Sequence, residues 1–139
     1  RKFLAEGDTR GAMLPFLIID AMRREAMALG IKSGADPEML YEVISNSAGS
    51  SWMFQNRVPH ILDGDYAPKS AVDIFTKDLG IVSDIGRGLK FPTPVASMAL
   101  QMFVMTAAAG MGRDDDASVA RMIATLVGLD LPGMTAQDV

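Results

Sequence analysis

The hydrophobic residues of this chain recur at the spacing of an α-helix, and no stretch sustains the apolar–polar alternation of a half-buried strand. The clearest case follows Pro94, where apolar residues three and four positions apart line one face: Val95, Met98, Ala99, Met102 and Met105. The composition supports helix packing, because eleven Met accompany only one Trp and six Phe, and Met fills irregular gaps between helices. We therefore predict an all-α fold.

Start and stop signals divide the chain into five or six predicted helices. Asp36, Pro37 and Glu38 give the strongest start, with an N-cap oxygen, a proline at the first helical position and a carboxylate in the first turn. Glycines and prolines mark most of the other ends. The predicted helices cover 12–29, a segment after Asp36, 52–57, 70–89, a segment from Pro94 to Gly110, and 117–126.

The length of 139 residues suits one globular domain whose core needs no metal or disulfide. We predict an N-terminal flank over 1–12, a helical domain over 13–127 and a fraying tail over 128–139. Within the first predicted helix, the segment from Leu14 to Ile19 is apolar on every side. We expect a second chain or domain to cover this segment, which predicts a dimer.

Charge and cysteine content exclude several function classes. The net charge is −4 and no basic stripe is present, which disfavours nucleic-acid binding. The absence of Cys removes disulfides, thiolate metal sites and a thiol nucleophile. The longest apolar run, Ala12 to Ile19, is too short to cross a bilayer, and no signal peptide precedes it. We expect a soluble, cytoplasmic protein that does not bind a membrane.

Two motifs invite a catalytic or phosphate-binding interpretation that the sequence does not favour. His60 is the only histidine, so a histidine metal site or a Ser–His–Asp triad would rest on it alone. We expect a packed or surface side chain there, and no metal. The turn Gly110-Met-Gly112 leads into Asp114, Asp115 and Asp116, whose carboxylates would repel a phosphate. We expect a turn between helices, with Asp115 or Asp116 capping the last one.

Lys77 is the first candidate for ligand binding. It lies one turn after Asp73 in a predicted helix whose other faces are apolar. The spacing favours an exposed i, i+4 ion pair, worth about 0.3 kcal/mol. The functional alternative is a lysine held in a cleft, where its ammonium orients an oxygen of a substrate or cofactor.

The second candidate is a polar group between Ser50 and Arg57. Its hydroxyl, indole, amide and guanidinium groups suit a small polyhydroxy acid: Ser50, Ser51, Trp52, Asn56 and Arg57. The structural alternative is a helix that Ser50 or Ser51 caps and that continues with a core Trp52. That alternative leaves Asn56 and Arg57 without a role.

In order and spacing, several segments resemble the C-terminal helical domain of the 3-hydroxyisobutyrate dehydrogenase (β-hydroxyacid dehydrogenase) family. They are Glu25-Ala-Met-Ala-Leu-Gly30, Ser50-Ser-Trp-Met-Phe-Gln-Asn-Arg57, Asp63-Gly-Asp-Tyr-Ala-Pro68, Lys77-Asp-Leu-Gly80, and Gly110-Met-Gly112 with Asp115-Asp116-Ala-Ser118. The resemblance runs from about Met13 to Leu126. Over 51–80 it is nearest to the threonate dehydrogenase branch, whose substrates are four-carbon sugar acids.

The resemblance implies a helical bundle of the 6-phosphogluconate dehydrogenase C-terminal type. In such enzymes an N-terminal Rossmann domain binds NAD or NADP, and the helical domain closes the active site and forms a homodimer. The Lys-Asp-Leu motif lies at the cofactor cleft, so the resemblance implies a cofactor-binding role for Lys77. Ser51, Asn56 and Phe75 become candidates for binding a small hydroxy acid.

Two departures from the family pattern matter. The chain contains no Gly-x-Gly-x-x-Gly unit of a dinucleotide-binding fold. Thr9 stands at the position of the family's catalytic lysine, and the adjacent Arg10 is a poor proton shuttle because arginine does not deprotonate in proteins. We therefore assign no catalytic residue.

The leading hypothesis is the helical domain of an NAD(P)-dependent hydroxyacid dehydrogenase, inactive without a Rossmann domain. One alternative is a helical dimerisation module without catalysis, motivated by Thr9. Another is an unrelated all-α ligand-binding bundle.

Overall fold

The computed structural model describes the backbone of residues 10–134 and the side chains of residues 18–134. Over this part of the chain it contains six α-helices, one π-helical turn and no strand. The helices are α1 (Arg10–Lys32), α2 (Pro37–Ser45), α3 (Trp52–Asp63), α4 (Val72–Leu89), α5 (Pro94–Thr106) and α6 (Ser118–Val127), with the π-helical turn η1 (Ala107–Met111) after α5. The predicted all-α fold with five to six helices is confirmed.

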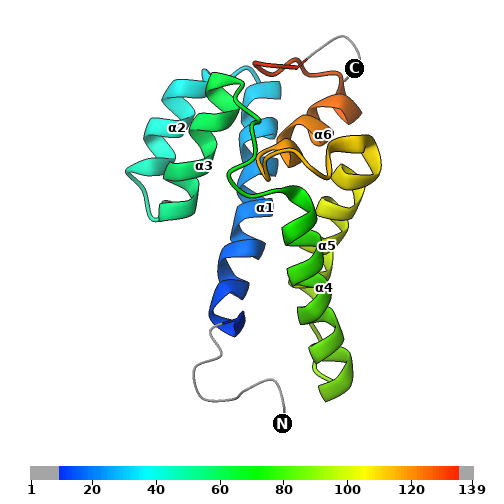
Figure 1. Cartoon of the computed structure of the whole chain (residues 1–139). Helices are drawn as coiled ribbons and strands as arrows, with labels where there is room; N and C mark the ends of the chain where they lie inside the picture. The colour runs from blue at the N-terminus through cyan, green and yellow to red at the C-terminus, as the bar shows by residue number, and fades with distance from the viewer. Residues whose placement is uncertain (1–9, 135–139) are drawn as a thin grey trace.

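The helices are arranged as two pairs on either side of α1. Figure 1 shows α2 and α3 together on one side of the long α1, and α4 with α5 on the other. The last helix, α6, packs beside the C-terminal half of α1 and against α5. The helices α4 and α5 form a helical hairpin. The joined end of this hairpin projects from the bundle in the same direction as the N-terminal half of α1 (Figure 1).

The main core lies between α1, α4, α5 and α6. The rings of Phe75 on α4 and Phe103 on α5 stack with centroids 4.8 Å apart, and both are almost fully buried. Small residues such as Ala21 on α1 and Ala99 on α5 let the helices approach closely around this pair. Such aromatic pairs add about 0.5–1.5 kcal/mol beyond the free energy of burying their area.

Helix starts follow the predicted caps. The Asp36 carboxylate accepts a hydrogen bond from the Met39 N–H at 2.8 Å and so caps α2. The Ser51 hydroxyl accepts from the Phe54 N–H at 3.1 Å and caps α3. A core position for Trp52 is wrong, because its side chain is 68% exposed and Phe54, at 1%, occupies the interior instead.

The predicted end of α3 before Pro59 is also wrong. The helix continues through Pro59 to Asp63. A proline lacks the N–H that would bond to the carbonyl four residues earlier, here that of Gln55. The Tyr41 hydroxyl, from α2, donates a hydrogen bond to the Gln55 carbonyl oxygen at 3.2 Å. The neighbouring helix thus supplies the donor that the proline removes.

The first helix is longer than the predicted 12–29, since it runs from Arg10 to Lys32. Most of the apolar segment from Leu14 to Ile19 lies outside the residues whose side chains are described. Within the described part, Ile18 packs partly buried against the main core and Ile19 is 36% exposed. Cover by another chain remains a prediction.

One helical stretch in the described residues, Pro94–Met111, is long and apolar enough to span a bilayer by length and composition alone. The core helix of a soluble protein meets the same criterion. Ala99 and Phe103 of this stretch are buried in the main core, and 28% of the stretch is buried overall. One such helix is weak evidence for a membrane span.

The segment after α6 packs back onto the bundle. Gly128, in the left-handed conformation, ends α6, and Leu131 then returns to the core with 5% exposure beside Ile61. A Cβ on Gly64, the left-handed C-cap of α3, would lie 2.6 Å from the Gly133 nitrogen. The tail predicted from residue 128 therefore belongs to the packed structure as far as Met134, and 135–139 lie outside the described residues.

Candidate functional site

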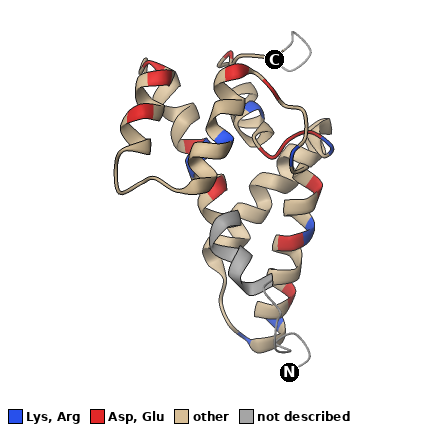
Figure 2. Ribbon diagram, turned by 60° about the vertical axis from the view of Figure 1, so that its left-hand side comes forward, with Lys and Arg blue, Asp and Glu red and all other residues tan. Residues whose placement is uncertain are grey.

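Lys77 projects from the outer side of α4. The helix buries Val72, Phe75 and Leu79 on one face. Residues two positions apart lie on nearly opposite sides of a helix, so burial of Phe75 turns Lys77 outward. The Lys77 side chain is 66% exposed. Both acidic and basic positions lie along α4 (Figure 2).

The ion pair predicted between Lys77 and Asp73 does not form in the described structure. The Lys77 ammonium lies 3.2 Å from the Asp78 carboxylate instead. Asp73 is drawn toward Gly112: its N–H donates to the Gly112 carbonyl at 2.9 Å, and a Cβ on Gly112 would lie 2.6 Å from its carboxylate. A residue distant in sequence therefore determines the position of Asp73, and the Lys77 ammonium is left in solvent beside Asp78.

Ser51 and Asn56 belong to α3. The Ser51 hydroxyl caps this helix and accepts a second hydrogen bond from the Arg23 guanidinium of α1. The Asn56 carboxamide oxygen accepts from Arg57 at 2.9 Å. Both side chains are partly buried.

The four predicted site residues do not converge on one cavity in the described structure. Ser51 and Asn56 lie on α3, on one side of α1, whereas Phe75 and Lys77 lie on α4, on the other (Figure 1). Phe75 is 4% exposed and belongs to the core. The α4 surface around Lys77 and the start of α3 are thus two separate regions of the candidate site.

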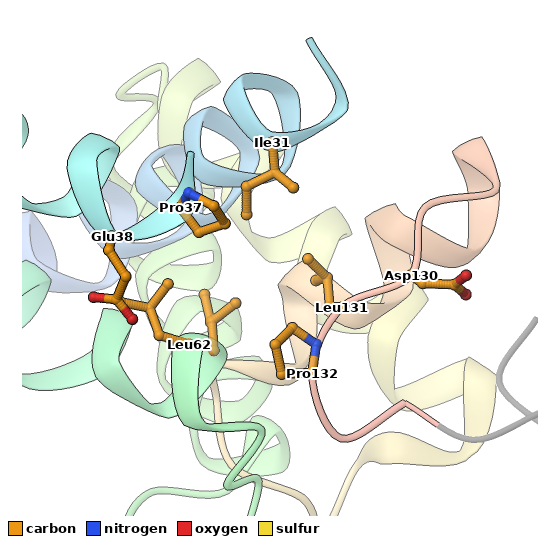
Figure 3. Close-up of a pocket in the computed structure, with 8 residues that line it drawn as sticks. Ile31, Pro37, Glu38, Leu62, Asp130, Leu131 and Pro132 are labelled. Atoms are coloured by element: carbon orange, nitrogen blue, oxygen red, sulfur yellow. The ribbon is translucent and has the colours of Figure 1, made fainter. Parts of the chain in front are cut away.

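A cavity of about 250 Å³ lies elsewhere, where α1, α2 and α3 meet the segment after α6. Figure 3 shows its apolar wall, with the carboxylates of Glu38 and Asp130 at its edges. Its lining residues are Ile31, Pro37, Glu38, Ile61, Leu62, Asp130, Leu131 and Pro132. None of the predicted site residues lines this cavity.

The interior contains a group of charged side chains that the sequence analysis did not identify. We call Asp20, Arg24, Arg57 and Asp116 the buried charge cluster. Arg24 Nη2 lies 2.5 Å from Asp20 Oδ2 and 3.1 Å from Asp116 Oδ2, and Arg57 Nε lies 3.4 Å from Asp116 Oδ1. The side chains of Asp20, Arg24 and Asp116 are at most 2% exposed. In the sequence, the i, i+4 spacing of Asp20 and Arg24 within an apolar helix face was the one feature that pointed to this cluster.

The cluster perturbs the acidity of its members. Burial raises the pKa of Asp116 to about 8, against the opposing effect of Arg24 and with a further rise from Asp20. Burial also raises the pKa of Asp20, again opposed by Arg24. Burial alone would lower the pKa of Arg24, but Asp20 and Asp116 raise it above its usual value, so this guanidinium stays charged.

Asp115 joins the cluster to His60 and Lys69. Its carboxylate accepts hydrogen bonds from the Ala117 and Lys69 N–H groups, each at 3.0 Å. His60 Nδ1 lies 3.3 Å from Asp115, and His60 Nε2 lies 2.7 Å from the Lys69 ammonium. Because an ammonium only donates, Nε2 accepts and Nδ1 carries the ring proton. Burial opposes ionisation, but the hydrogen bonds hold the pKa of Asp115 below its usual value.

The acidic run thus forms the predicted turn before α6 rather than a phosphate site. Asp115 accepts a hydrogen bond from the Ala117 N–H, Asp116 enters the buried charge cluster, and Asp114 pairs with Arg121 at 2.9 Å. The predicted cap of the last helix by Asp115 or Asp116 is wrong, because Ala117 is the N-cap residue of α6 and no side chain caps it. His60 is a packed side chain, 4% exposed. Within the described residues, no three acidic, histidine or cysteine side chains gather as a metal site would require.

Comparison with protein families gives a match over most of the chain. Residues 16–123 match the family model described as "NAD-binding of NADP-dependent 3-hydroxyisobutyrate dehydrogenase". The matched segment includes both the α4 region with Lys77 and the start of α3 with Ser51.

Characterised proteins with similar sequences are hydroxyacid dehydrogenases. The L-threonate dehydrogenase of Cupriavidus necator is 57% identical over 113 residues, which are 81% of this chain and 37% of that enzyme. The L-threonate dehydrogenase of Escherichia coli K12 is 50% identical over 109 residues, 78% of this chain and 35% of that enzyme. The human mitochondrial 3-hydroxyisobutyrate dehydrogenase is 33% identical over 71% of this chain and 32% of its own length. The chain therefore spans about a third of the length of these relatives.

A solved structure agrees with these relatives. The 3-hydroxyisobutyrate dehydrogenase of Salmonella typhimurium superimposes with a TM-score of 0.81 at 46% identity, over 84% of this chain and 41% of that one. The Mycobacterium tuberculosis 3-hydroxyisobutyrate dehydrogenase shares the fold with a TM-score of 0.74 at 20% identity, over 83% of this chain and 42% of that one.

Proposed function

Because the chain belongs to the 3-hydroxyisobutyrate dehydrogenase family, we propose that it acts as the helical domain of an NAD(P)-dependent hydroxyacid dehydrogenase. The enzyme would oxidise the alcohol of a small hydroxycarboxylic or sugar acid by hydride transfer. The observation that carries the proposal is the 57% identity with an L-threonate dehydrogenase over 113 residues. That identity favours a sugar acid of the threonate type as substrate.

The described residues fit the edge of a nicotinamide site rather than the whole of one. The turn at Gly110 leads into carboxylates that would repel a pyrophosphate, and it follows a helix rather than a strand. Lys77, in contrast, presents an exposed ammonium from a helix whose opposite face is fixed in the core. When bound, NAD(P) accepts the hydride. Lys77 would contribute a positive charge beside the cofactor or the substrate oxygen, while another domain holds the dinucleotide.

Substrate contacts are proposed for Ser51 and Asn56. A hydroxyl and a carboxamide both donate and accept hydrogen bonds, which suits the hydroxyl groups of a sugar acid. Ser51 keeps its hydroxyl donor, because both of its lone pairs accept from Phe54 and Arg23, and Asn56 keeps its amide donors. Phe75 was predicted in the same role, but its burial favours a contribution through packing, which fixes the position of α4 and hence of Lys77.

A homodimer is proposed as the assembled form, in the cytoplasm, with no nucleic-acid or membrane partner. The outer face of α5 supports the dimer. Val95, Met98 and Met105 on this face are 53%, 71% and 45% exposed, and they share one side of the helix. A second copy would remove this apolar surface from water.

A pair of chimeras tests the proposed function. In the first, residues 16–123 replace the matching segment of the C. necator L-threonate dehydrogenase, so that the recipient keeps its dinucleotide-binding domain and the residue opposite Thr9. In the second, the replacement extends from residue 1. Reduction of NAD or NADP with L-threonate and 3-hydroxyisobutyrate is followed by absorbance.

We expect turnover from the first chimera. Replacing Lys77 by Ala should lower its kcat/KM by about 10- to 100-fold, since one preorganised charge is lost. Arg87→Ala, at an exposed position of the same helix, serves as the control and should leave kcat/KM unchanged. A folded first chimera that binds NAD(P) but oxidises no hydroxy acid would refute the proposal. Inactivity of the second chimera alone would support the non-catalytic module.

A further inference from the structure

The interior around the buried charge cluster holds more acidic than basic groups. Three carboxyl groups, those of Asp20, Asp115 and Asp116, face two guanidinium groups, those of Arg24 and Arg57. The three carboxyl side chains are at most 2% exposed, and Arg24 is 1% exposed and Arg57 12%. An unbalanced charge in such a place is strongly disfavoured, because water cannot solvate it.

The charge states of the surrounding groups are fixed by their contacts. Asp115 is ionised, since its oxygens accept hydrogen bonds from two backbone N–H groups and face the Nδ1–H of His60. His60 Nε2 faces the Lys69 ammonium, which only donates, so His60 presents its Nδ1–H to Asp115. Asp114 is engaged with Arg121 on the outside. The two guanidinium groups balance only two of the three carboxylates. With Asp115 ionised, the carboxyl without a countercharge is therefore that of Asp20 or Asp116.

Further groups at the edge do not change this balance. The Arg23 guanidinium faces Asp20 but is only partly buried and donates to Ser51. Lys69 is exposed. On the α5 side, Arg24 lies against the uncharged ring of Phe103, with the guanidinium carbon 5.8 Å from its centroid. Charges that remain in contact with water are screened and compensate an interior group only weakly.

We propose that the buried charge cluster together with Asp115 binds one proton at neutral pH, held between Asp20 and Asp116, and that release of this proton loosens α6 from α1. The geometry supports a shared proton, because the buried side chains of Asp20 and Asp116 are hydrogen-bonded to each other and lie on either side of Arg24 Nη2. One proton makes three carboxyls and two guanidiniums neutral overall. Its loss leaves a net negative charge in the interior between the two helices.

The pKa of Asp116 determines how the stability of the folded state changes with pH. Burial raises its pKa in the folded chain to about 8 from the ordinary value of 3.8, so the folded state holds a proton that the unfolded state releases. Stability from this group is therefore complete below about pH 4 and is lost as pH rises toward 8. The folded state is then weakest above that pH.

Loosening at the cluster would be transmitted to α4. The segment that carries Asp116 is hydrogen-bonded to the stretch leading into that helix: the Asp116 N–H donates to the Ser70 carbonyl at 2.8 Å, and the Val72 N–H donates to the Asp114 carbonyl at 3.0 Å. Val72 is the first residue of α4, on which Lys77 lies one turn further on. The cluster is thus a pH-sensitive connection between α1, α6 and the α4 surface.

The test follows carboxyl titration and local opening in the full chain. Aspartate is labelled with ¹³C at its carboxyl carbon, and NMR spectra are recorded from pH 5 to 9. One aspartate carboxyl should remain protonated at pH 6 and titrate near pH 8. In parallel, the hydrogen-exchange protection of the α6 amides, corrected for intrinsic exchange rates, should fall several-fold between pH 6 and 8.5.

Two variants make the assignment specific. Asp116→Asn keeps the shape of the protonated acid but cannot ionise, so it should abolish both the late titration and the loss of protection. Asp84→Asn, at an exposed position on α4, is the matched control and should retain both. If every aspartate of the wild type is ionised at pH 6, or if protection in α6 is independent of pH, the proposal is wrong. The wild-type spectra decide this even if Asp116→Asn does not fold.

Discussion

Arg24 is a fully buried cation that joins two buried carboxyl groups. Its guanidinium is 1% exposed, contacts Asp20 and Asp116, and lies over the ring of Phe103. A buried ion pair adds little net stability over a well-packed apolar replacement, yet removal of one partner leaves a buried charge without compensation. The structure therefore predicts a large effect at this one position of α1.

Arg24→Ala should lower the free energy of unfolding by about 3–5 kcal/mol at pH 7. The loss should be smaller at pH 5, because protonation then neutralises the abandoned carboxyl groups. Arg87→Ala, whose partner Asp84 is exposed, should change the free energy of unfolding by at most about 1 kcal/mol. Urea titrations followed by circular dichroism measure both. Equal effects of the two substitutions would contradict the structural role of Arg24.

At the scale of the residue, sequence reasoning succeeded where both partners are close along the chain. Asp36 caps α2 through a bond to Met39, three residues on. The pair of Lys77 with Asp73 was wrong because Gly112, far along the chain, draws Asp73 away. Asp20 and Arg24 were visible as an i, i+4 pair, but Asp116 comes from a distant segment, so the local signal did not reveal the second partner of Arg24.

In α3, a contact with the neighbouring helix α2 allows the helix to continue past a proline that would otherwise end it. Local rules end a helix before an internal proline. Tyr41 donates to the carbonyl that Pro59 leaves without a partner, and Val58 and Ile61 are buried on either side of the proline. Tertiary contacts therefore outweigh the local preference, and the prediction of helix number succeeded better than that of helix ends.

A double-mutant cycle tests this account of α3. Tyr41→Phe removes the donor to Gln55 and should cost about 0.5–1.5 kcal/mol of stability. In a Pro59→Ala background, the alanine N–H can bond to the same carbonyl, so Tyr41→Phe should then cost less. Both free energies of unfolding come from urea titrations. An identical cost in the two backgrounds would show that the tyrosine does not compensate for the proline.

At the scale of the whole molecule, the exposed apolar face of α5 predicts self-association. Met98→Glu should shift the chain from dimer to monomer in sedimentation-velocity experiments, because it places a charge in the proposed interface. Met39→Glu is the matched control, since Met39 is similarly exposed but lies on α2. A wild-type monomer at high concentration would contradict the proposed dimer.

The family could be recognised from ordered motifs, whereas the spatial relation of the predicted site residues could not. Ser51 and Lys77 lie in motifs that the sequence shows directly, yet they belong to helices on opposite sides of α1. Phe75 lies two residues before Lys77 on α4 and turns into the core. A motif gives the order of residues, while the packing of the helix decides which of them face a ligand.

The proposed function requires that the chain complete a site for hydride transfer from a hydroxy acid to NAD(P). Isotope transfer in the chimera carrying residues 16–123 tests it most directly. The chimera is incubated with oxidised cofactor and a hydroxy acid deuterated at the carbinol carbon, and the reduced cofactor is analysed by mass spectrometry. The account predicts deuterium in the reduced nicotinamide. Reduced cofactor without deuterium, or none at all from a folded chimera that binds NAD(P), would contradict it.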